Sequence, residues 1–184
     1  MTSFAAIDFE TANYDRDSAC AIGVVVCAEG RIVERQHHLI RPPSERFVFT
    51  YLHGIGWEQV AAAPSFGELW PTLRPLLRQV DFLAAHNASF DRSVLHACCQ
   101  SHGLPALRKS FTCTVDLARR QLSIYPTKLP DVCRRLRIDL RHHQADSDAE
   151  ACARIVLAAE QEGWRHPTRP PPPARPCRPA LPAT

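Results

Sequence analysis

Hydrophobic and polar residues alternate over residues 3–9, with the period of two that is typical of β-strands. Two further strands are predicted at the valine-rich residues 20–27 and at residues 31–41. Glu29-Gly30 has the composition of a tight turn, and Pro42-Pro43 ends the third run because proline cannot donate to a strand ladder. The pattern predicts an antiparallel meander of three strands.

The spacing of apolar residues becomes helical after residue 65. An apolar residue recurs every three or four positions at Phe66, Leu69, Leu73, Leu76 and Leu77. Pro71 and Pro75 fall inside this pattern. Because proline removes a backbone donor from a helix interior, the helix is predicted to be short or kinked.

Strands and helices alternate in the rest of the chain. A strand at 81–85 leads into a helix at 89–101, and a strand at 110–115 leads into a helix near 116–121. Two more helices are predicted at 129–136 and 146–161. Three strands followed by alternating strands and helices predict an α/β fold with a mixed sheet flanked by helices.

Composition divides the chain into a domain at 1–162 and a Pro/Arg-rich tail at 163–184. The tail carries four arginines and no acid, and it is predicted to be disordered or polyproline II because it cannot build a core. The other 18 basic residues stand against 19 acids, so the domain has a net charge of −1 although the whole chain has +3. Such a domain needs local basic groups or bound cations to accept phosphate.

Nothing in the sequence predicts a membrane anchor or a secretory signal. The longest apolar stretch, residues 19–28, is too short to cross a bilayer, and the N-terminus lacks a basic region followed by an apolar one. The 8 cysteines include the adjacent Cys98 and Cys99 but form no C-x-x-C pair, which disfavours a zinc site. We therefore expect a cytoplasmic protein with buried free thiols.

Acidic residues stand where predicted strands end or helices begin. Asp8 and Glu10 share one side of the first strand, and two such close carboxylates repel unless a cation lies between them. Asp91 falls in the first turn of the helix at 89–101, for which Asn87 or Ser89 could be the cap. Taken singly, a solvated strand end and a helix-start acid also explain these positions.

A third acidic position lies in residues 141–150, Arg-His-His-Gln-Ala-Asp-Ser-Asp-Ala-Glu. Histidines precede the last helix there, and acids occupy its first turn. Asp146 or Ser147 could be a plain N-cap, and the two histidines could be surface residues. The three acidic positions together are more specific, because a set of oxygen ligands suits a hard divalent cation such as Mg²⁺ or Mn²⁺.

In these motifs the chain resembles the DEDDh 3′→5′ exonucleases, the group that includes the proofreading subunit of bacterial DNA polymerase III. The matching segments are Asp-Phe-Glu-Thr at 8–11, His-Asn-Ala-Ser-Phe-Asp at 86–91 and His-Gln-Ala-Asp-Ser-Asp-Ala at 143–149. The resemblance spans residues 4–160. It implies a ribonuclease H-like fold whose mixed sheet has five strands, three antiparallel and then two parallel.

The resemblance also implies site residues. The metal ligands would be Asp8, Glu10, Asp91 and Asp148, and the general base would be His143, which the family's spacing selects over His142. Thr11 would meet the substrate's 3′ end through backbone groups. His53 and Ile55 belong to a His-Gly-Ile segment similar to a loop that lines the terminal-nucleotide pocket in these enzymes.

The expected reaction is hydrolysis of phosphodiester bonds from the 3′ end of single-stranded DNA or frayed duplex ends, which releases nucleoside 5′-monophosphates. Two Mg²⁺ or Mn²⁺ ions are expected, one held by Asp8, Glu10 and Asp148 and the other by Asp8 with Asp91. His143 would accept the proton of the attacking water near neutral pH.

Other functions are compatible with parts of the pattern. The same fold could trim RNA as an exonuclease or oligoribonuclease, serve as a non-catalytic polymerase-accessory protein that binds nucleic acid, or act as a phosphatase on small molecules. We expect nucleic acid with a free 3′ end as the partner, DNA rather than RNA. Residues 121–125, Gln-Leu-Ser-Ile-Tyr, loosely resemble peptides that dock on bacterial sliding clamps, although their place at a helix end favours Leu122 and Ile124 as core residues.

Overall fold

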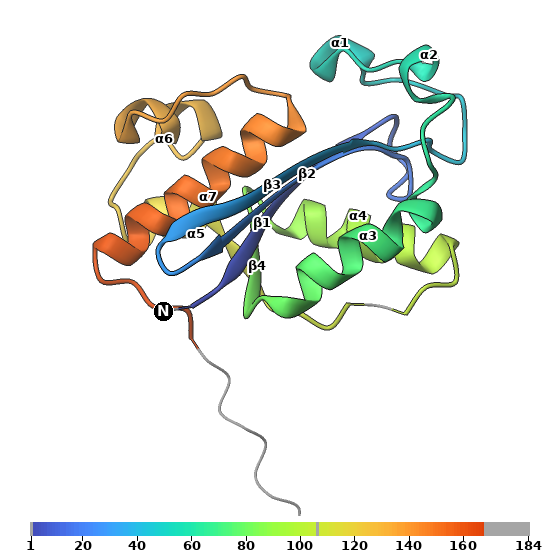
Figure 1. Ribbon diagram of the computed structural model, residues 1–184. Helices are drawn as coiled ribbons and strands as arrows, with labels where there is room; N and C mark the ends of the chain where they lie inside the picture. The colour runs from blue at the N-terminus through green and yellow to red at the C-terminus, as the bar shows by residue number, and fades with distance from the viewer. Residues whose placement is uncertain (1, 106, 168–184) are drawn as a thin grey trace, which may run out of the picture.

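The computed structural model describes residues 2–105 and 107–167, and its centre is a five-stranded sheet in the order β3-β2-β1-β4-β5 (Figure 1). The strands are β1 (Phe4–Thr11), β2 (Ala19–Ala28), β3 (Arg31–Leu39), β4 (Phe82–Ala85) and β5 (Phe111–Cys113). β1, β2 and β3 pair antiparallel, whereas β4 is parallel to both β1 and β5. The predicted ribonuclease H-like α/β fold is confirmed.

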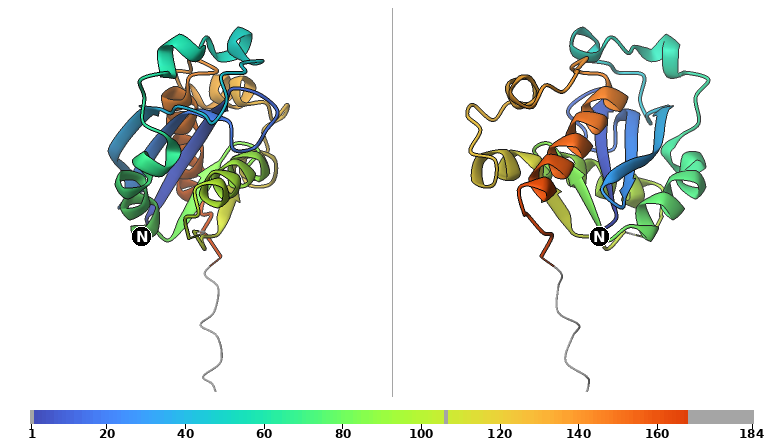
Figure 2. Two further views of the ribbon diagram at one scale, coloured as in Figure 1. Left: turned by 90° about the vertical axis from the view of Figure 1, so that its right-hand side faces the viewer. Right: turned by 60° about the vertical axis from the view of Figure 1, so that its left-hand side comes forward.

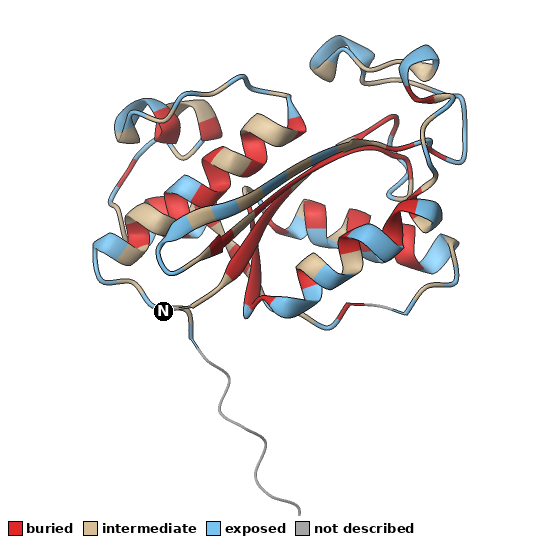
Figure 3. Cartoon of the chain, in the orientation of Figure 1, coloured by how far each residue is buried: buried red, intermediate tan, exposed pale blue. Residues whose placement is uncertain are grey.

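Helices cover both faces of the sheet (Figures 1 and 2). One face carries α3 (Phe66–Gln79) and α4 (Ser89–Ser101), and the other carries α5 (Thr114–Arg120), α6 (Leu129–Leu136) and α7 (Ala145–Gln161). Two short helices, α1 (Thr50–His53) and α2 (Trp57–Val60), lie beyond one end of the sheet (Figure 1). The buried residues of the large helices face the sheet (Figure 3).

Alternation along β1 decides which residues enter which core. Ala5, Ile7 and Phe9 pack with α3 and α4, whereas Phe4 and Ala6 pack with α5, α6 and α7. Because side chains of a strand alternate between its faces, Asp8 and Glu10 continue the row of Phe4 and Ala6. They therefore point to the face on which α7 lies.

The helix α3 differs from its prediction, because it runs for 14 residues with Pro71 and Pro75 inside it. Both prolines lie on the exposed side, whereas Phe66, Leu73 and Leu77 are buried on the other. The prolines do not interrupt the packed side of the helix, and burial of that apolar side stabilises the whole helix. The expectation was a short or kinked helix, and of these two alternatives the short helix was wrong.

The local details of several helix starts also differ. Ala88 is the N-cap residue of α4 and Gln144 that of α7, and neither helix has a side-chain cap. The capping roles considered for Asn87, Ser89, Asp146 and Ser147 were therefore wrong. β5 is only three residues long because α5 begins at Thr114, and α1 and α2 were not predicted.

The chain continues past α7 along the sheet. Trp164 packs edge-on against Phe82 with ring centroids 5.9 Å apart, and His166 stacks on Phe82 at 4.1 Å. These contacts tie residues 164 and 166 to the domain, although they follow the predicted boundary at 162. The remainder of the predicted tail, from residue 168, lies outside the described residues.

The other expectations for the whole chain can be compared with the described residues. Their seven cysteines are free thiols, and six of these are buried. Across residues 2–105 and 107–167, no helix combines the length and apolar character needed to span a membrane. Ile124 is buried and Leu122 packs against the same core, so the segment at 121–125 is part of the folded domain.

Candidate active site

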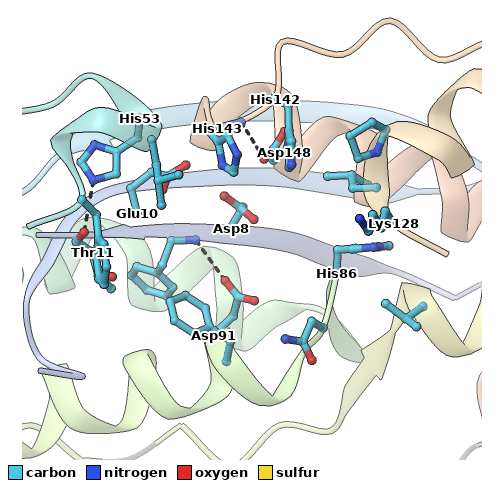
Figure 4. A pocket seen from close by; sticks show the side chains of 18 residues that line it. Asp8, Glu10, Thr11, His53, His86, Asp91, Lys128, His142, His143 and Asp148 are labelled. Carbon is cyan, nitrogen blue, oxygen red and sulfur yellow. Dashed lines mark hydrogen bonds and ion pairs between the residues drawn. The ribbon is translucent and has the colours of Figure 1, made fainter. Parts of the chain in front are cut away.

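The end of β1 supplies the first two carboxylates. Asp8 pairs with Gly23 of β2, and Glu10 pairs with Ala21 just before a shift of register between Glu10 and Thr11. Irregular pairing of this kind bends a strand and re-aims its side chains. Asp8 and Glu10 both line a cavity of about 720 Å³ at this end of the sheet (Figure 4).

Asp91 reaches the same place from the first turn of α4. Its Oδ1 accepts a hydrogen bond of 3.0 Å from the backbone amide of Phe9. The pairing between β1 and β4 covers only residues 4–6 of β1, so the Phe9 amide lies beyond the last rung of that ladder. The Asp91 carboxylate thus accepts a hydrogen bond from a backbone amide of β1 that has no partner in β4. This bond fixes the Asp91 side chain beside β1.

α7 and the turn before it supply the last carboxylate and the two histidines. Asp148 lies in the first turns of α7, where the helix dipole favours an anion. Its Oδ2 accepts from the backbone amide of His143 at 3.1 Å, and it lies 2.9 Å from Nδ1 of His142. The two imidazole rings stack with centroids 3.9 Å apart. His142 is therefore engaged with Asp148, and both histidines line the cavity together with the carboxylates (Figure 4).

A glycine permits α7 to lie this close to the sheet. A Cβ on Gly23 would collide with the carbonyl oxygen of Ala145, the first residue of α7. Since Gly23 also pairs with Asp8, the closest approach of α7 to β2 lies beside the first carboxylate. This contact brings Asp148 next to Asp8.

Three of the carboxylates form one cluster. Ligand oxygens of Asp8, Glu10 and Asp148 all lie within 4.8 Å of one another. Ring nitrogens of His142 and His143 form a second set of the same size with Asp148. Asp91 belongs to neither set, although its charge acts on Asp8.

The cluster is electrostatically unfavourable without a cation. Burial first, and then repulsion from Asp91, Asp148 and Glu10, holds the pKa of Asp8 well above its usual range. Burial and Asp148 raise the pKa of Glu10 to about 7, and burial is also the main cause that raises the pKa of Asp91 to about 7. Carboxyl groups whose pKa is raised to neutral pH are typical of sites that bind a cation.

His53 joins the loop after β1 to the loop after α1. Gly54 ends α1 with a φ of 76°, a left-handed conformation that glycine adopts without strain. The His53 Nδ1 accepts from the Ile55 amide at 3.1 Å, so Nε2 carries the proton and donates to the Thr11 carbonyl at 3.2 Å. Burial lowers the pKa of His53, which keeps the ring neutral in this role.

The structure brings most of the predicted site residues together. Asp8, Glu10, Asp91, His143, Asp148, Thr11 and His53 all line the cavity. Ile55 is not among the lining residues, because it packs with Ala12, Cys20 and Val60 in a separate small cluster. The wall also contains residues to which the sequence assigned no role, among them Phe49, Leu52, His86, Val115, Lys128, Leu129 and Pro130.

Comparison with known proteins agrees with this site. A protein-family model described as an exonuclease matches residues 5–156. The chain belongs to this exonuclease family. A relative of the chain, the PolC-type DNA polymerase III of Thermotoga petrophila, is 30% identical over 159 residues. That match covers 84% of this chain and 12% of the polymerase, so the chain spans a small part of its relative's length.

Solved structures share the architecture of the chain. Exonuclease X in complex with 5′ overhanging duplex DNA is 25% identical with a TM-score of 0.73, and the match covers 90% of this chain and 96% of that one. The nuclease domain of 3′hExo, a DEDDh family member bound to rAMP, has the same fold at 21% identity and a TM-score of 0.72, with 88% and 93% covered. These findings confirm the resemblance to the DEDDh exonucleases.

Proposed function

We propose that the chain is a divalent-cation-dependent 3′→5′ exonuclease that hydrolyses phosphodiester bonds and releases nucleoside 5′-monophosphates. The observation that carries the proposal is the cluster of Asp8, Glu10 and Asp148 oxygens within 4.8 Å of one another. These residues come from β1 and α7, about 140 positions apart in the sequence, so it is the tertiary fold that brings their carboxylates together.

The residues present fit a hard divalent cation. Asp148 Oδ1 is buried and has no hydrogen-bond partner in the described part of the chain. A buried carboxylate oxygen without a partner carries a desolvation cost that a ligated cation would offset. The donors around it are carboxylate oxygens, which Mg²⁺ and Mn²⁺ prefer.

Asp8, Glu10 and Asp148 would hold one cation, and Asp8 with Asp91 would hold the second. When bound, such a pair supplies positive charge that stabilises both the attacking and the leaving oxygen of an in-line displacement. The bond from the Phe9 amide to Oδ1 of Asp91 would orient this carboxylate before any ligand arrives.

His143 would accept the proton of the attacking water. It lines the cavity, and burial together with the neighbouring His142 lowers its pKa, so the ring is neutral at physiological pH. The bond from His142 to Asp148 makes His142 a positioning group that orients a carboxylate. His53 and the Thr11 backbone would form the end of the cavity that receives the terminal nucleotide.

We further propose that the substrate is a DNA strand with a free 3′ end, in the cytoplasm, with a polymerase as a candidate partner. Exonuclease X, at 25% identity, was solved with duplex DNA, and the relatives at 30% identity are DNA polymerases. The sugar preference depends on whether the site admits a 2′-OH, which separates RNA from DNA.

The test is digestion of matched DNA and RNA oligomers labelled at the 5′ end, with Mg²⁺, with Mn²⁺ and with EDTA. We expect a ladder that shortens from the 3′ end, faster on DNA, with no cleavage in EDTA and recovery when either metal is restored. An oligomer whose 3′ end is blocked should resist, and one with a blocked 5′ end should not.

Two outcomes would contradict the proposal. Full activity in EDTA would show that the reaction needs no divalent cation. Shortening from the 5′ end would show that the proposed 3′→5′ direction is wrong. Faster digestion of RNA would instead assign the chain to RNA trimming on the same site. Hydrolysis of mononucleotides alone would indicate a phosphatase.

A further inference from the structure

The two ends of the cavity differ in chemistry. Thr11 and His53 lie at one end, His86 and Lys128 at the other, and Asp8 lies between them (Figure 4). In the proposed function the first end receives the terminal nucleotide and the bond is cut near Asp8. The strand on the 5′ side of that bond must then leave the cavity past His86 and Lys128.

Lys128 is the only lysine or arginine among the described residues that line the cavity. Its side chain is exposed, and it forms no ion pair with any residue that the structure describes. Four carboxylates line the same cavity. A phosphate that enters such an acidic site is repelled unless a cation lies on its path, and an unpaired lysine provides one.

The backbone that carries Lys128 is held on both sides. The Lys128 carbonyl accepts from the amides of Asp131 and Val132, at 2.9 and 3.1 Å, in the first turn of α6. The preceding carbonyl, that of Thr127, lies 2.9 Å from Nε2 of His86. The Lys128 Cα is therefore fixed at the rim, whereas the aliphatic stem leaves the ammonium free to follow a ligand.

His86 has the tautomer that this arrangement needs. A carbonyl oxygen only accepts, so Nε2 carries the proton, and Nδ1 accepts from the hydroxyl of Thr114 at 2.8 Å. Thr114 is fully buried at the start of α5. Through these two bonds the end of β4 holds the segment that presents Lys128.

We infer that Lys128 binds the internucleotide phosphate that directly precedes the scissile phosphate on its 5′ side. The inference rests on the proposed function, which sets the direction of the strand. A lysine contact to phosphate carries no information about the base, so Lys128 contributes affinity without sequence preference.

The first test compares a substrate that has this phosphate with one that lacks it. Oligothymidylate contains it, whereas the p-nitrophenyl ester of thymidine 5′-monophosphate has only the phosphate that is attacked. We expect Lys128→Ala to lower the ratio of kcat/KM on the oligomer to kcat/KM on the ester about fivefold. Lys128→Arg should restore most of the ratio, because it retains the charge.

Salt dependence provides a second readout with a matched control. Loss of one phosphate contact should make the slope of log kcat/KM against log salt concentration less steep by about 0.7 for a single strand. Arg78→Ala removes the same charge from a separate hollow that also contains Arg74 and Lys109, and it should leave the slope unchanged. An equal effect of both variants would mean that net charge, rather than a contact, is responsible.

A neutral methylphosphonate at the preceding position identifies the phosphate. It should slow the parent protein about as much as Lys128→Ala does, and the variant should lose nothing more on that substrate. The inference would be overturned if Lys128→Ala lowered kcat/KM as much on the methylphosphonate substrate as on the charged one. It would also be overturned if the oligomer-to-ester ratio did not change. If the parent protein hydrolysed neither oligomer nor ester, the proposed function itself would fail.

Discussion

At the scale of single residues, the site is a set of acids that folding places too close together. Asp8, Glu10 and Asp91 all have raised pKa values, those of Glu10 and Asp91 at about 7. A carboxyl with a raised pKa binds more protons in the folded than in the unfolded state between its two pKa values. The free energy of unfolding therefore falls as pH rises from about 4 to about 7, unless a cation is bound.

The variant Asp8→Asn tests this repulsion. In EDTA at pH 8 we expect its free energy of unfolding to exceed that of the parent by on the order of 2 kcal/mol, so that it unfolds at a higher temperature, and we expect no detectable nuclease activity. Asp139→Asn removes a charge from an exposed position and should change neither property. The comparison is made by thermal unfolding at pH 5 and pH 8, and a lower unfolding temperature for Asp8→Asn at pH 8 would contradict the electrostatic account.

The adjacent histidines are predicted to differ in their effects. His143→Ala should lower kcat by about 10²–10⁴-fold while titration calorimetry still detects metal uptake. His142→Ala removes the bond to Asp148 Oδ2 and should cost less, about 10-fold, with weaker metal binding. If His142→Ala had the larger effect on kcat and left metal binding intact, the base would be His142.

At the scale of elements, the decisive contact is between β2 and α7. Gly23 faces the Ala145 carbonyl so closely that no Cβ fits between them, and Arg35 of β3 pairs with Glu150 of α7 at 2.8 Å. The Glu150 carboxylate also pairs with Arg154 at 2.6 Å, so the contact belongs to a small, partly exposed network. The glycine contact sets how far α7 stands from β1, and therefore where Asp148 lies relative to Asp8.

Gly23→Ala should affect the site more than the fold. We expect a loss of stability of about 1–3 kcal/mol, together with a loss of metal affinity and activity, because the start of α7 must move away from β2. Gly103→Ala is the matched control, since Gly103 has a φ of +62° and nothing near its Cβ position. It should lower the unfolding temperature through backbone strain but preserve metal binding. A Gly23→Ala variant with normal metal affinity would contradict the claim that Gly23 sets the distance between α7 and β1.

At the scale of the whole molecule, two helical layers cover one sheet, and the segment after α7 completes the second layer. Phe82 stacks on Phe4 and also contacts Trp164 and His166. His166 lies 3.1 Å from the Ser110 hydroxyl beside β5. The domain thus includes residues that composition alone assigns to the tail.

Truncation separates the packed residues from the rest of the tail. A chain that ends at Pro167 should keep the kcat and the unfolding temperature of the parent. A chain that ends at Glu162 should lose about 2 kcal/mol of stability, because it loses the aromatic contacts to Phe82, but should keep its kcat at low temperature. Calorimetry and single-turnover assays on both chains provide the measurements. A large fall in kcat for the longer chain would assign residues 168–184 a catalytic role.

The sequence by itself determined the elements and most of the chemistry. Alternation predicted β1 and a valine-rich run predicted β2, and the sequence also predicted β3, α4, α6 and α7, because the patterns of strands and helices follow from local geometry. The three acidic motifs, and the family resemblance that they carry together, named Asp8, Glu10, Asp91, His143 and Asp148, which the structure places around one cavity. These residues could be named without coordinates because the combination of motifs is specific, although each motif is ambiguous alone.

Only the tertiary structure decided how these groups meet. α3 continues through two prolines because its other side is buried, and α1 has four residues, too few for any periodicity. The approach of α7 to Gly23, the bond from Phe9 to Asp91 and the place of Lys128 at the rim join segments far apart in the chain. Such contacts depend on packing between elements, which the local pattern of a sequence does not contain.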